Sequence, residues 1–366
     1  MKHKNIISVF IFAIVVGAIS LGCFFKPHTQ YSESERRLLE KKPVFTKETL
    51  FSGSYTRDFE KYVTDQFPYR DGFRSVKALF STYVFNKMEN NGLFTAEGHI
   101  SKMEYPVNSH MVDNAQQKFD NLYEKYMKDK NVNIYLSIIP DKNYFLAKKH
   151  GYLSIDYDAF IKDFKDRMDY MKYIDVLPML SLDDYYKTDS HWRQEKITDI
   201  AEHIAESMGA DASAEYIENT LDNPFHGVYL GQSALPFKPD TIKYLTNDIL
   251  ENCIVKYYDT GMAKEGDMYN MDKAYGKDPY EMFLSGTSPL ITIENPNAKE
   301  GKELILFRDS YGSSLTPLLA PAYSKITVVD IRYIQSDFLG SFIDFDNKDI
   351  LFMYSTTLLN NSMAMR

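Results

Sequence analysis

The clearest pattern along the chain is a set of continuous apolar runs separated by segments with helical spacing. The runs lie at 132–139, 303–308, 325–331 and 349–355, and a shorter strand is predicted at 174–177. Strands of a parallel sheet are buried on both faces and therefore read as unbroken stretches of Val, Ile, Leu and Phe. Helical spacing is found at 112–128, 158–171 and 197–208. The pattern predicts an α/β fold, with a parallel sheet flanked by helices that make right-handed crossovers.

Two other regions have a different pattern. Residues 28–106 are helical and loop-rich, with apolar residues at helical spacing up to Phe67 and a helix end at Pro68. Residues 222–300 contain turns and short strands, as expected of an insertion or covering subdomain. We therefore expect a first segment at 1–27, the helical and loop segment at 28–106, and an α/β domain at 107–366 with the insertion at about 222–300.

The first segment sets the expected location. Lys2 and Lys4 precede an uncharged apolar span from Ile6 to Phe25. At 1.5 Å per residue this span crosses a bilayer of about 30 Å, with the basic end in the cytoplasm. A cleaved signal peptide is the alternative, and Cys23 resembles a lipoprotein cleavage site. We expect an uncleaved signal anchor, with the rest of the chain outside the cell membrane.

Composition excludes some classes of function. The net charge of −9 argues against a nucleic-acid partner, because phosphate binding needs clustered Lys and Arg. The two cysteines, Cys23 and Cys253, form neither a disulfide framework nor a Cys-based metal site. The chain has 28 Tyr residues, which suit glycan contacts but more simply fill the core. No metal and no cofactor are expected.

The first piece of candidate chemistry is at the end of the run at 303–308, where Ser310 is followed by Tyr311 and Gly312. A strand would deliver this serine to the carboxyl edge of the sheet. The following helix would direct its backbone N–H groups and partial positive charge at it. Ser313 and Ser314 are competitors, but they lie further into the helix, where a hydroxyl usually bonds back to the chain.

The second piece is the segment 188–192, with the sequence Thr-Asp-Ser-His-Trp. A serine needs a base and a group that orients this base, and Asp189 and His191 can supply both to Ser310. The alternative is that Asp189 caps the next helix and His191 lies on the surface. Metal binding is a weaker reading, because no third ligand lies nearby in the sequence. Asp309 is expected to cap the following helix.

These two segments together resemble the DHHW proteins, which are similar to the SGNH-hydrolase-like domains of the alginate O-acetylation proteins. The resemblance runs from about Ser32 to the C-terminus, and includes a Ser-Glu-Arg-Arg stretch near 34, Asp65-Gln-Phe-Pro-Tyr-Arg70 and Ile139-Pro-Asp-Lys142. It implies an SGNH-hydrolase-like fold with a triad of Asp189, His191 and Ser310. The implied activity is acetyl transfer to an exported cell-surface polysaccharide, with a multi-pass membrane acyltransferase as acetyl supplier.

This sequence also departs from the family pattern. Arg308 stands where SGNH enzymes often have Gly, and the separate Gly and Asn blocks of an oxyanion hole are missing. The backbone N–H groups of Ser310 and Tyr311 are candidate oxyanion donors. Asn143 and Arg308 are further oxyanion or substrate candidates.

Two other residues of the matching motifs are ambiguous. Trp192 is expected to pack behind His191, with carbohydrate stacking as the alternative, and Lys142 either lines the site or is a solvated loop lysine. A carbohydrate acetylesterase with the same triad, or a non-catalytic glycan- or partner-binding protein, remains open as an alternative function.

Overall fold

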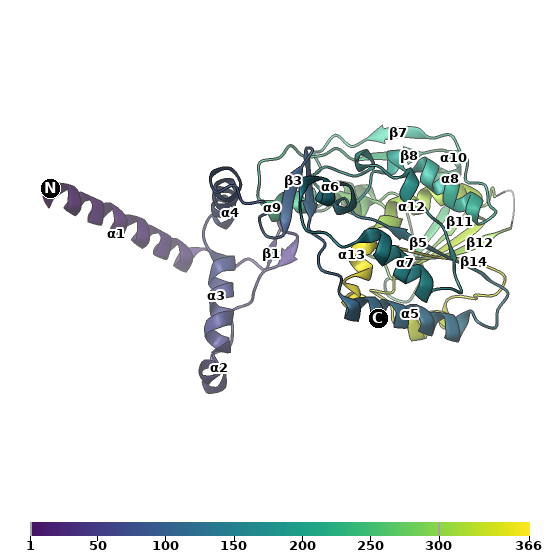
Figure 1. Cartoon of the computed structure of the whole chain (residues 1–366), viewed down its shortest axis with the longest axis horizontal. Coiled ribbons are helices and arrows are strands. Elements are labelled where there is room, and N and C mark those ends of the chain that lie inside the picture. Colours follow the sequence, from purple (N-terminus) through teal and green to yellow (C-terminus); the bar gives the residue numbers. More distant parts are fainter. Residues whose placement is uncertain (1, 299–300) are drawn as a thin grey trace. The chain divides into compact units, whose positions relative to one another are not determined.

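The computed structural model describes residues 2–298 and 301–366, which form two compact units (Figure 1). Unit 1 contains the residues up to Asn91 together with Val228–Phe237. Unit 2 contains Gly92–Gly227 and Lys238–Arg366.

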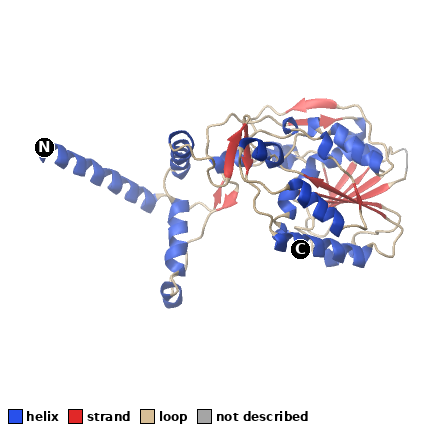
Figure 2. Cartoon of the chain, in the orientation of Figure 1, coloured by secondary structure: helices blue, strands red, loops and turns tan. Residues whose placement is uncertain are grey.

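Unit 1 is mainly helical (Figure 2). Its elements are α1 (Lys2–Phe25), β1 (Tyr31–Ser32), β2 (Arg37–Leu38), α2 (Lys47–Phe51), α3 (Ser54–Gln66), α4 (Arg70–Leu79), the π-helical turn η1 (Phe80–Val84) and α9 (Val228–Ser233). Among the described residues, α1 is the one helix that is long and apolar enough to cross a membrane, over Ile6–Phe25. Its location near the N-terminus is shared by anchors and signal sequences.

Unit 2 is built on an eight-stranded sheet with the order β10-β9-β11-β13-β12-β14-β5-β6. The strands from β13 to β6 are parallel, and β11, β9 and β10 continue the sheet in antiparallel pairing. In chain order, these strands are β5 (Asn133–Ile139), β6 (Lys172–Tyr173), β9 (Ile254–Tyr257), β10 (Lys264–Gly266), β11 (Leu290–Glu294), β12 (Glu303–Arg308), β13 (Lys325–Val329) and β14 (Asp349–Ser355). The predicted α/β class is confirmed.

Longer helices cover the two faces of this sheet, α8 and α12 on one and α5 and α7 on the other (Figure 1). Their bounds are α5 (Ser109–Tyr126), α7 (Tyr157–Arg167), α8 (Thr198–Ser207) and α12 (Tyr311–Leu319). Successive residues of one strand point to opposite faces of the sheet and pack into two different hydrophobic clusters. In β12, Leu306 packs in the cluster on the α8 side and Phe307 in the cluster on the α7 side. Because both faces are covered, the middle residues of the central strands are mainly apolar.

The remaining elements of unit 2 are short. They are β3 (Leu93–Ala96), β4 (His99–Lys102), α6 (Asn143–His150), β7 (Ile217–Thr220), β8 (Lys243–Thr246), α10 (Asp248–Asn252), α11 (Met271–Ala274), α13 (Thr356–Leu359), and the 3₁₀ turns η2 (Leu177–Met179), η3 (Leu182–Asp184), η4 (Gln194–Lys196), η5 (Pro279–Met282), η6 (Ala320–Ala322), η7 (Ser336–Ser341) and η8 (Ser362–Ala364). β3 pairs with β4, and β7 pairs with β8.

Two local expectations differ from the structure. The strand predicted at 174–177 is instead β6, two residues long and located at Lys172–Tyr173, because only that segment pairs with β5. Part of the turn-rich region at 222–300 does not merely cover the fold. Its strands β9, β10 and β11 widen the sheet on the β13 side, because β11 pairs along the whole of β13.

Candidate active site

Ser310 lies where a central strand becomes a helix. β12 is flanked by parallel neighbours on both sides and ends at Arg308, and α12 begins at Tyr311 with Ser310 as its N-cap residue. The side chain of Ser310 makes no capping hydrogen bond to the helix. Its hydroxyl is therefore available for other contacts, at the positive end of the α12 dipole.

The second part of the site is a loop that returns on itself. Tyr185 and Trp192 form an antiparallel bridge, and the N–H of Tyr186 donates to the carbonyl of His191 over 3.1 Å. Asp189 and His191 lie near the tip of this loop. The backbone N–H of His191 donates to Asp189 Oδ1 over 3.1 Å, which brings the carboxylate beside the imidazole.

The two parts meet in one chain of hydrogen bonds. His191 Nδ1 lies 2.6 Å from Asp189 Oδ1, and His191 Nε2 lies 2.8 Å from Ser310 Oγ. A carboxylate only accepts hydrogen bonds, so Nδ1 carries the proton and Nε2 accepts from the serine hydroxyl. Asp189 is fully buried, whereas Ser310 and His191 are partly exposed. The structure thus brings together the three residues predicted to form the triad, and leaves Ser310 and His191 partly exposed.

Two residues outside the motifs, Asp240 and Gly227, support this loop. The carboxylate of Asp240 accepts from the N–H groups of Lys187 and Thr188 over 3.0 and 2.7 Å, and from the Thr188 hydroxyl. Gly227 lies directly against the same segment, where a Cβ would come within 2.3 Å of the Thr188 carbonyl group. The loop conformation is therefore set by residues that the motifs did not indicate.

Lys142 supports the same loop. Its ammonium donates to the carbonyls of Tyr186 and Lys187 over 2.8 and 3.2 Å. Burial lowers the pKa of this lysine to about 7, although the charge of Asp189 acts in the opposite direction. The idea of a solvated loop lysine is therefore wrong. Lys142 is a buried residue that positions the backbone before Asp189.

Tyr280 is a site residue that sequence reasoning missed. Its ring stacks on the imidazole of His191, and its hydroxyl bonds to the carbonyl of Ser310 over 3.3 Å and to Ser314 Oγ over 2.9 Å. Tyr280 lies in η5, in the turn-rich region, and no local motif marks it. The only sequence signal is the general abundance of tyrosine.

Trp192 is completely buried. Its indole N–H donates to the carbonyl of Tyr311 and to Ser314 Oγ, both over 3.0 Å. The alternative of carbohydrate stacking is therefore wrong for this residue, because neither ring face reaches solvent. Ser314 was a competitor of Ser310 for the role of nucleophile. Its hydroxyl bonds to Trp192 and Tyr280 rather than to His191.

Tyr311 does not offer the oxyanion donor that was expected. Its backbone N–H donates to Asp309 Oδ1 over 3.0 Å, and its phenol donates to the carbonyl of Ser190 over 2.6 Å. The other oxygen of Asp309 accepts from the N–H and the hydroxyl of Ser355. Although Ser310 is the N-cap residue, the side chain of Asp309 accepts from the first N–H group of α12, as predicted for a cap, and also joins the start of this helix to the end of β14.

The remaining two candidates are engaged elsewhere. Arg308 is buried, lies 3.5 Å from Asp330 Oδ2, and donates to the carbonyls of Asp309 and Gly286. Burial lowers its pKa from the ordinary arginine value. Asn143 is buried at the start of α6 and donates to Ser154 Oγ over 3.2 Å. Among the hydrogen bonds of the described residues, none joins either side chain to the Ser310 hydroxyl.

No protein-family model matches the chain, and no curated protein sequence matches it. Solved structures do match. A DHHW family protein from Eubacterium siraeum has a TM-score of 0.58 and 20% identity, over 75% of this chain and 95% of its own. Bacillus cereus PatB1 with a sulfonyl adduct has a TM-score of 0.60 and 19% identity, over 73% and 95%.

The O-acetyltransferase domain of Pseudomonas putida AlgJ agrees more loosely, with a TM-score of 0.42 and 12% identity over 74% of this chain and 92% of its own. At 20% identity and below, such matches describe the fold of a protein rather than its activity. The chain therefore has the fold of the solved DHHW family protein, and the resemblance seen in its motifs is confirmed at that level.

Proposed function

We propose that the chain is an extracytoplasmic O-acetyltransferase that uses Ser310, His191 and Asp189 to place acetyl groups on an exported cell-surface polysaccharide. The observation that carries the proposal is the continuous hydrogen-bond path from Asp189 through His191 to Ser310, with distances of 2.6 and 2.8 Å. A serine hydroxyl is a poor nucleophile at neutral pH, and this path supplies the base and the orienting group that it needs.

In the first step, Ser310 Oγ attacks the acetyl carbonyl of a donor ester while its proton passes to His191 Nε2. The developing imidazolium is stabilised by Asp189, which also holds the tautomer with the proton on Nδ1. The bond to the donor oxygen then breaks, and His191 returns the proton to this leaving oxygen. The product is an acetyl ester on Ser310.

In the second step, a sugar hydroxyl attacks the acetyl ester. Its proton passes to His191 Nε2, the bond to Ser310 Oγ breaks, and the serine recovers a proton from the imidazolium. Each tetrahedral intermediate needs hydrogen-bond donors for its oxyanion. Because the N–H of Tyr311 is used by Asp309, the N–H of Ser310 itself is the candidate donor from this segment.

The polysaccharide substrate and the outward location are parts of the same proposal. α1 offers a 20-residue apolar span without buried residues, as expected of an anchor that leaves unit 2 outside the cell membrane. A multi-pass membrane acyltransferase would then supply the acetyl group from the cytoplasmic side. The fold shared with the DHHW family protein and PatB1 is compatible with this role.

The first test asks whether Ser310 is an activated nucleophile. PatB1 was solved with a sulfonyl adduct, and sulfonyl fluorides react with activated serines. We expect phenylmethylsulfonyl fluoride to add one sulfonyl group to the full chain, located at Ser310 by peptide mass spectrometry. The Ser310→Ala variant should gain none. An unlabelled wild-type chain, together with no turnover of a chromogenic acetyl ester, would favour the non-catalytic reading.

The second test separates transfer from hydrolysis. The full chain is incubated with a chromogenic acetyl ester, with and without an oligosaccharide, and both products are measured. Transfer predicts acetylated sugar and faster ester consumption when the oligosaccharide is present. Brisk hydrolysis without any acetylated sugar would replace the transferase with a carbohydrate acetylesterase that has the same triad.

A further inference from the structure

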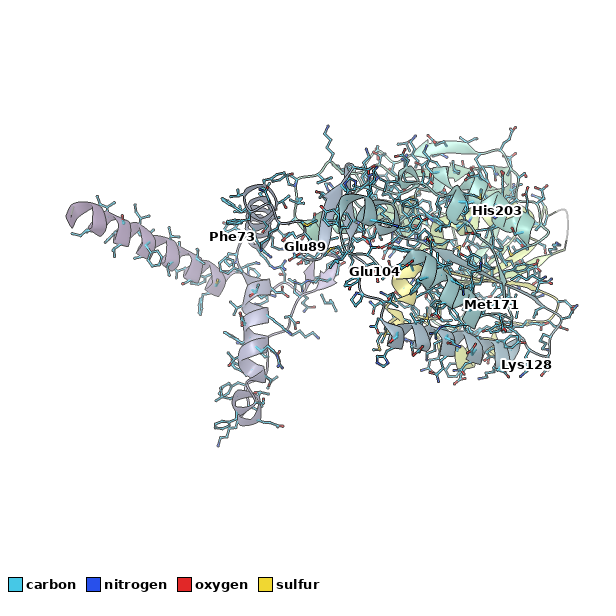
Figure 3. All side chains as sticks on the ribbon, viewed as in Figure 1. Phe73, Glu89, Glu104, Lys128, Met171 and His203 are labelled. Carbon is cyan, nitrogen blue, oxygen red and sulfur yellow. The ribbon has the colours of Figure 1, made fainter. Side chains whose placement is uncertain are left out.

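The distribution of side chains around α4 in unit 1 is the reverse of that in a soluble helix. Arg70 and Arg74 have side chains that are only 14% and 15% exposed. On the other side, Tyr69, Phe73 and Phe80 are 87%, 53% and 52% exposed. Figure 3 labels Phe73 among the side chains drawn on this part of the ribbon. A helix that turns its arginines inward and its aromatic rings outward is suited to an apolar surrounding.

The exposed apolar residues follow one helical face. They recur at spacings of three, four or one along α4 and into η1, and we call them the apolar face of α4: Tyr69, Phe73, Val76, Phe80, Tyr83 and Val84. Scattered apolar residues on a surface are normal, but a continuous face of this length marks an interaction site. The tyrosines also match the residues that gather at the interface between a membrane and water.

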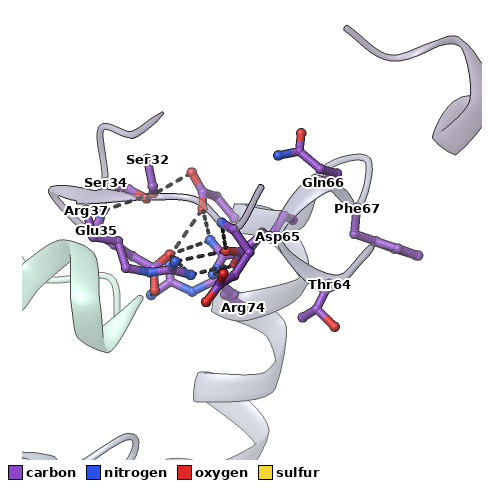
Figure 4. A network of polar contacts seen from close by, with 12 residues as sticks. Ser32, Ser34, Glu35, Arg37, Thr64, Asp65, Gln66, Phe67 and Arg74 are labelled. Carbon is purple, nitrogen blue, oxygen red and sulfur yellow. Dashed lines mark hydrogen bonds and ion pairs between the residues drawn. The ribbon is translucent and has the colours of Figure 1, made fainter. Parts of the chain in front are cut away.

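An ion-pair network fixes this orientation (Figure 4). Arg70 pairs with Glu35 over 2.5 Å and with Asp65 over 3.3 Å, and Arg74 pairs with Glu35 over 3.3 Å. Arg37 pairs with Asp65 over 2.6 Å. The network joins the β1–β2 hairpin, the end of α3 and the start of α4, so the arginines cannot rotate outward without breaking several charge-assisted contacts.

The corner between α3 and α4 is also joined to the end of the apolar span. Thr29 and Gln66 exchange two hydrogen bonds, from Thr29 N to Oε1 over 3.0 Å and from Nε2 to the Thr29 carbonyl over 2.8 Å. Lys26 Nζ donates to the carbonyl of Phe67 over 3.3 Å. A Cβ on Gly22, which lies inside the span, would be 3.2 Å from the ring of Pro68. The apolar face of α4 thus begins at Tyr69, directly after Pro68, the proline that lies beside Gly22 of the apolar span.

We propose that the apolar face of α4 lies in the outer surface of the lipid bilayer, as an interfacial helix beside the end of the membrane anchor. Its continuity with the span at Gly22 and Pro68 selects the bilayer over other apolar partners. Interfacial helices bury one face at the boundary between headgroups and acyl chains. This inference rests on the proposed retention of α1 as an anchor. It adds a second attachment that would restrict how the rest of unit 1 moves over the membrane.

The test uses the full chain in nanodiscs of phosphatidylethanolamine and phosphatidylglycerol, one chain per disc. Cys23→Ser and Cys253→Ala remove the two native cysteines, and nitroxide labels are attached at Phe73→Cys or Phe80→Cys in separate variants. Leu153→Cys is the matched control, because Leu153 is 57% exposed and belongs to unit 2. Power-saturation spectra compare collisions with lipid-soluble oxygen and with a water-soluble nickel chelate.

We expect the labels at 73 and 80 to collide with the nickel chelate several-fold less often than the label at 153, and more often with oxygen. Equal nickel access at all three positions overturns the proposal. A label at Val15→Cys, inside the span, separates the causes. If this label is shielded while 73 and 80 are open to water, the interfacial helix fails and the anchor stands. If Val15→Cys is also open to water, the anchor itself has failed and the interfacial helix fails with it.

Discussion

The ring of Tyr280 lies flat against the imidazole of His191, with ring centroids 3.9 Å apart and 9° between the planes. The phenol of Tyr280 is itself held by Ser314 and by the carbonyl of Ser310. The imidazole is therefore held at its edge by Asp189 and on one face by Tyr280. Such a base needs little reorganisation before it accepts the proton of Ser310.

Replacing Tyr280 should separate these two roles. Tyr280→Leu removes the stacked ring, and since aromatic pairs contribute about 0.5–1.5 kcal/mol, we expect kcat for an acetyl ester to fall by up to about tenfold with little change in KM. Tyr280→Phe keeps the ring and should retain more of the activity. Tyr275→Leu, at an exposed tyrosine, is the control. An unchanged kcat in Tyr280→Leu would contradict a positioning role.

Removing either reacting side chain should have a much larger effect. We expect Ser310→Ala and His191→Ala each to lower kcat by about 10³-fold or more, and the double variant to be no worse than the single ones, because the residues act as one unit. The measurement is turnover of a chromogenic acetyl ester. Ser313→Ala is the matched control in the same helix. If Ser313→Ala lost activity and Ser310→Ala retained it, the nucleophile would be Ser313 and not Ser310.

A substitution at Gly227 tests whether activity depends on the position of the loop that carries Asp189 and His191. In Gly227→Ala the added methyl group would overlap the Thr188 carbonyl, so the loop that carries Asp189 and His191 must shift. A displacement of about 1 Å costs up to about 10²-fold in rate, and we expect lower kcat with an unchanged circular dichroism spectrum. Gly72→Ala is the control, because its Cβ would meet nothing within 4 Å. Full activity in Gly227→Ala would show that the loop tolerates the shift.

The lowered pKa of the buried Lys142 should make the stability of the protein depend on pH. Burial lowers its pKa to about 7 from an ordinary value of 10.5, so between these values the unfolded chain binds more protons than the folded chain. The free energy of unfolding should therefore rise with pH above 7.5, by at most about 1.4 kcal/mol per pH unit. Asp141, whose pKa burial raises to about 7, gives the opposite slope below pH 7.

The window for this measurement is therefore pH 7.5 to 9.5, with urea unfolding of the detergent-solubilised chain followed by the fluorescence of Trp192. Lys142→Met should remove the rise, and Lys148→Met, at an exposed lysine of the helix α6 that follows Lys142, should keep it. A rise that persists in Lys142→Met would assign the titration to another group.

Several elements could be predicted from the sequence because their signal is local. The apolar runs predicted at 132–139 and 303–308 are β5 and β12, since strands covered on both faces need apolar residues throughout. Asp309 as a cap and Ser310 at the start of a helix follow from the change of pattern at the end of β12. The pairing of Asp189 with His191 could also be predicted, because these residues are only two positions apart in the chain.

Other features depend on contacts between distant parts of the chain. Tyr280 reaches His191 only because the fold brings η5 beside the loop. The antiparallel extension of the sheet by β9 to β11 depends on pairing with β13, which no single segment encodes. For Lys142, the sequence could not decide between a solvated loop position and a place in the site, and only the neighbouring elements of the fold show that it is buried.

The sequence alone thus determined the apolar span, the central apolar strands such as β5 and β12, and the residue types that could form a proton relay, because each depends on residues that are close together in the chain. Only the tertiary structure decided that His191 Nε2 lies 2.8 Å from Ser310 Oγ and that the N–H of Tyr311 is already used by Asp309. The reason is physical: hydrogen bonding depends on distances and directions of a few tenths of an ångström, and the packing of the whole domain sets these.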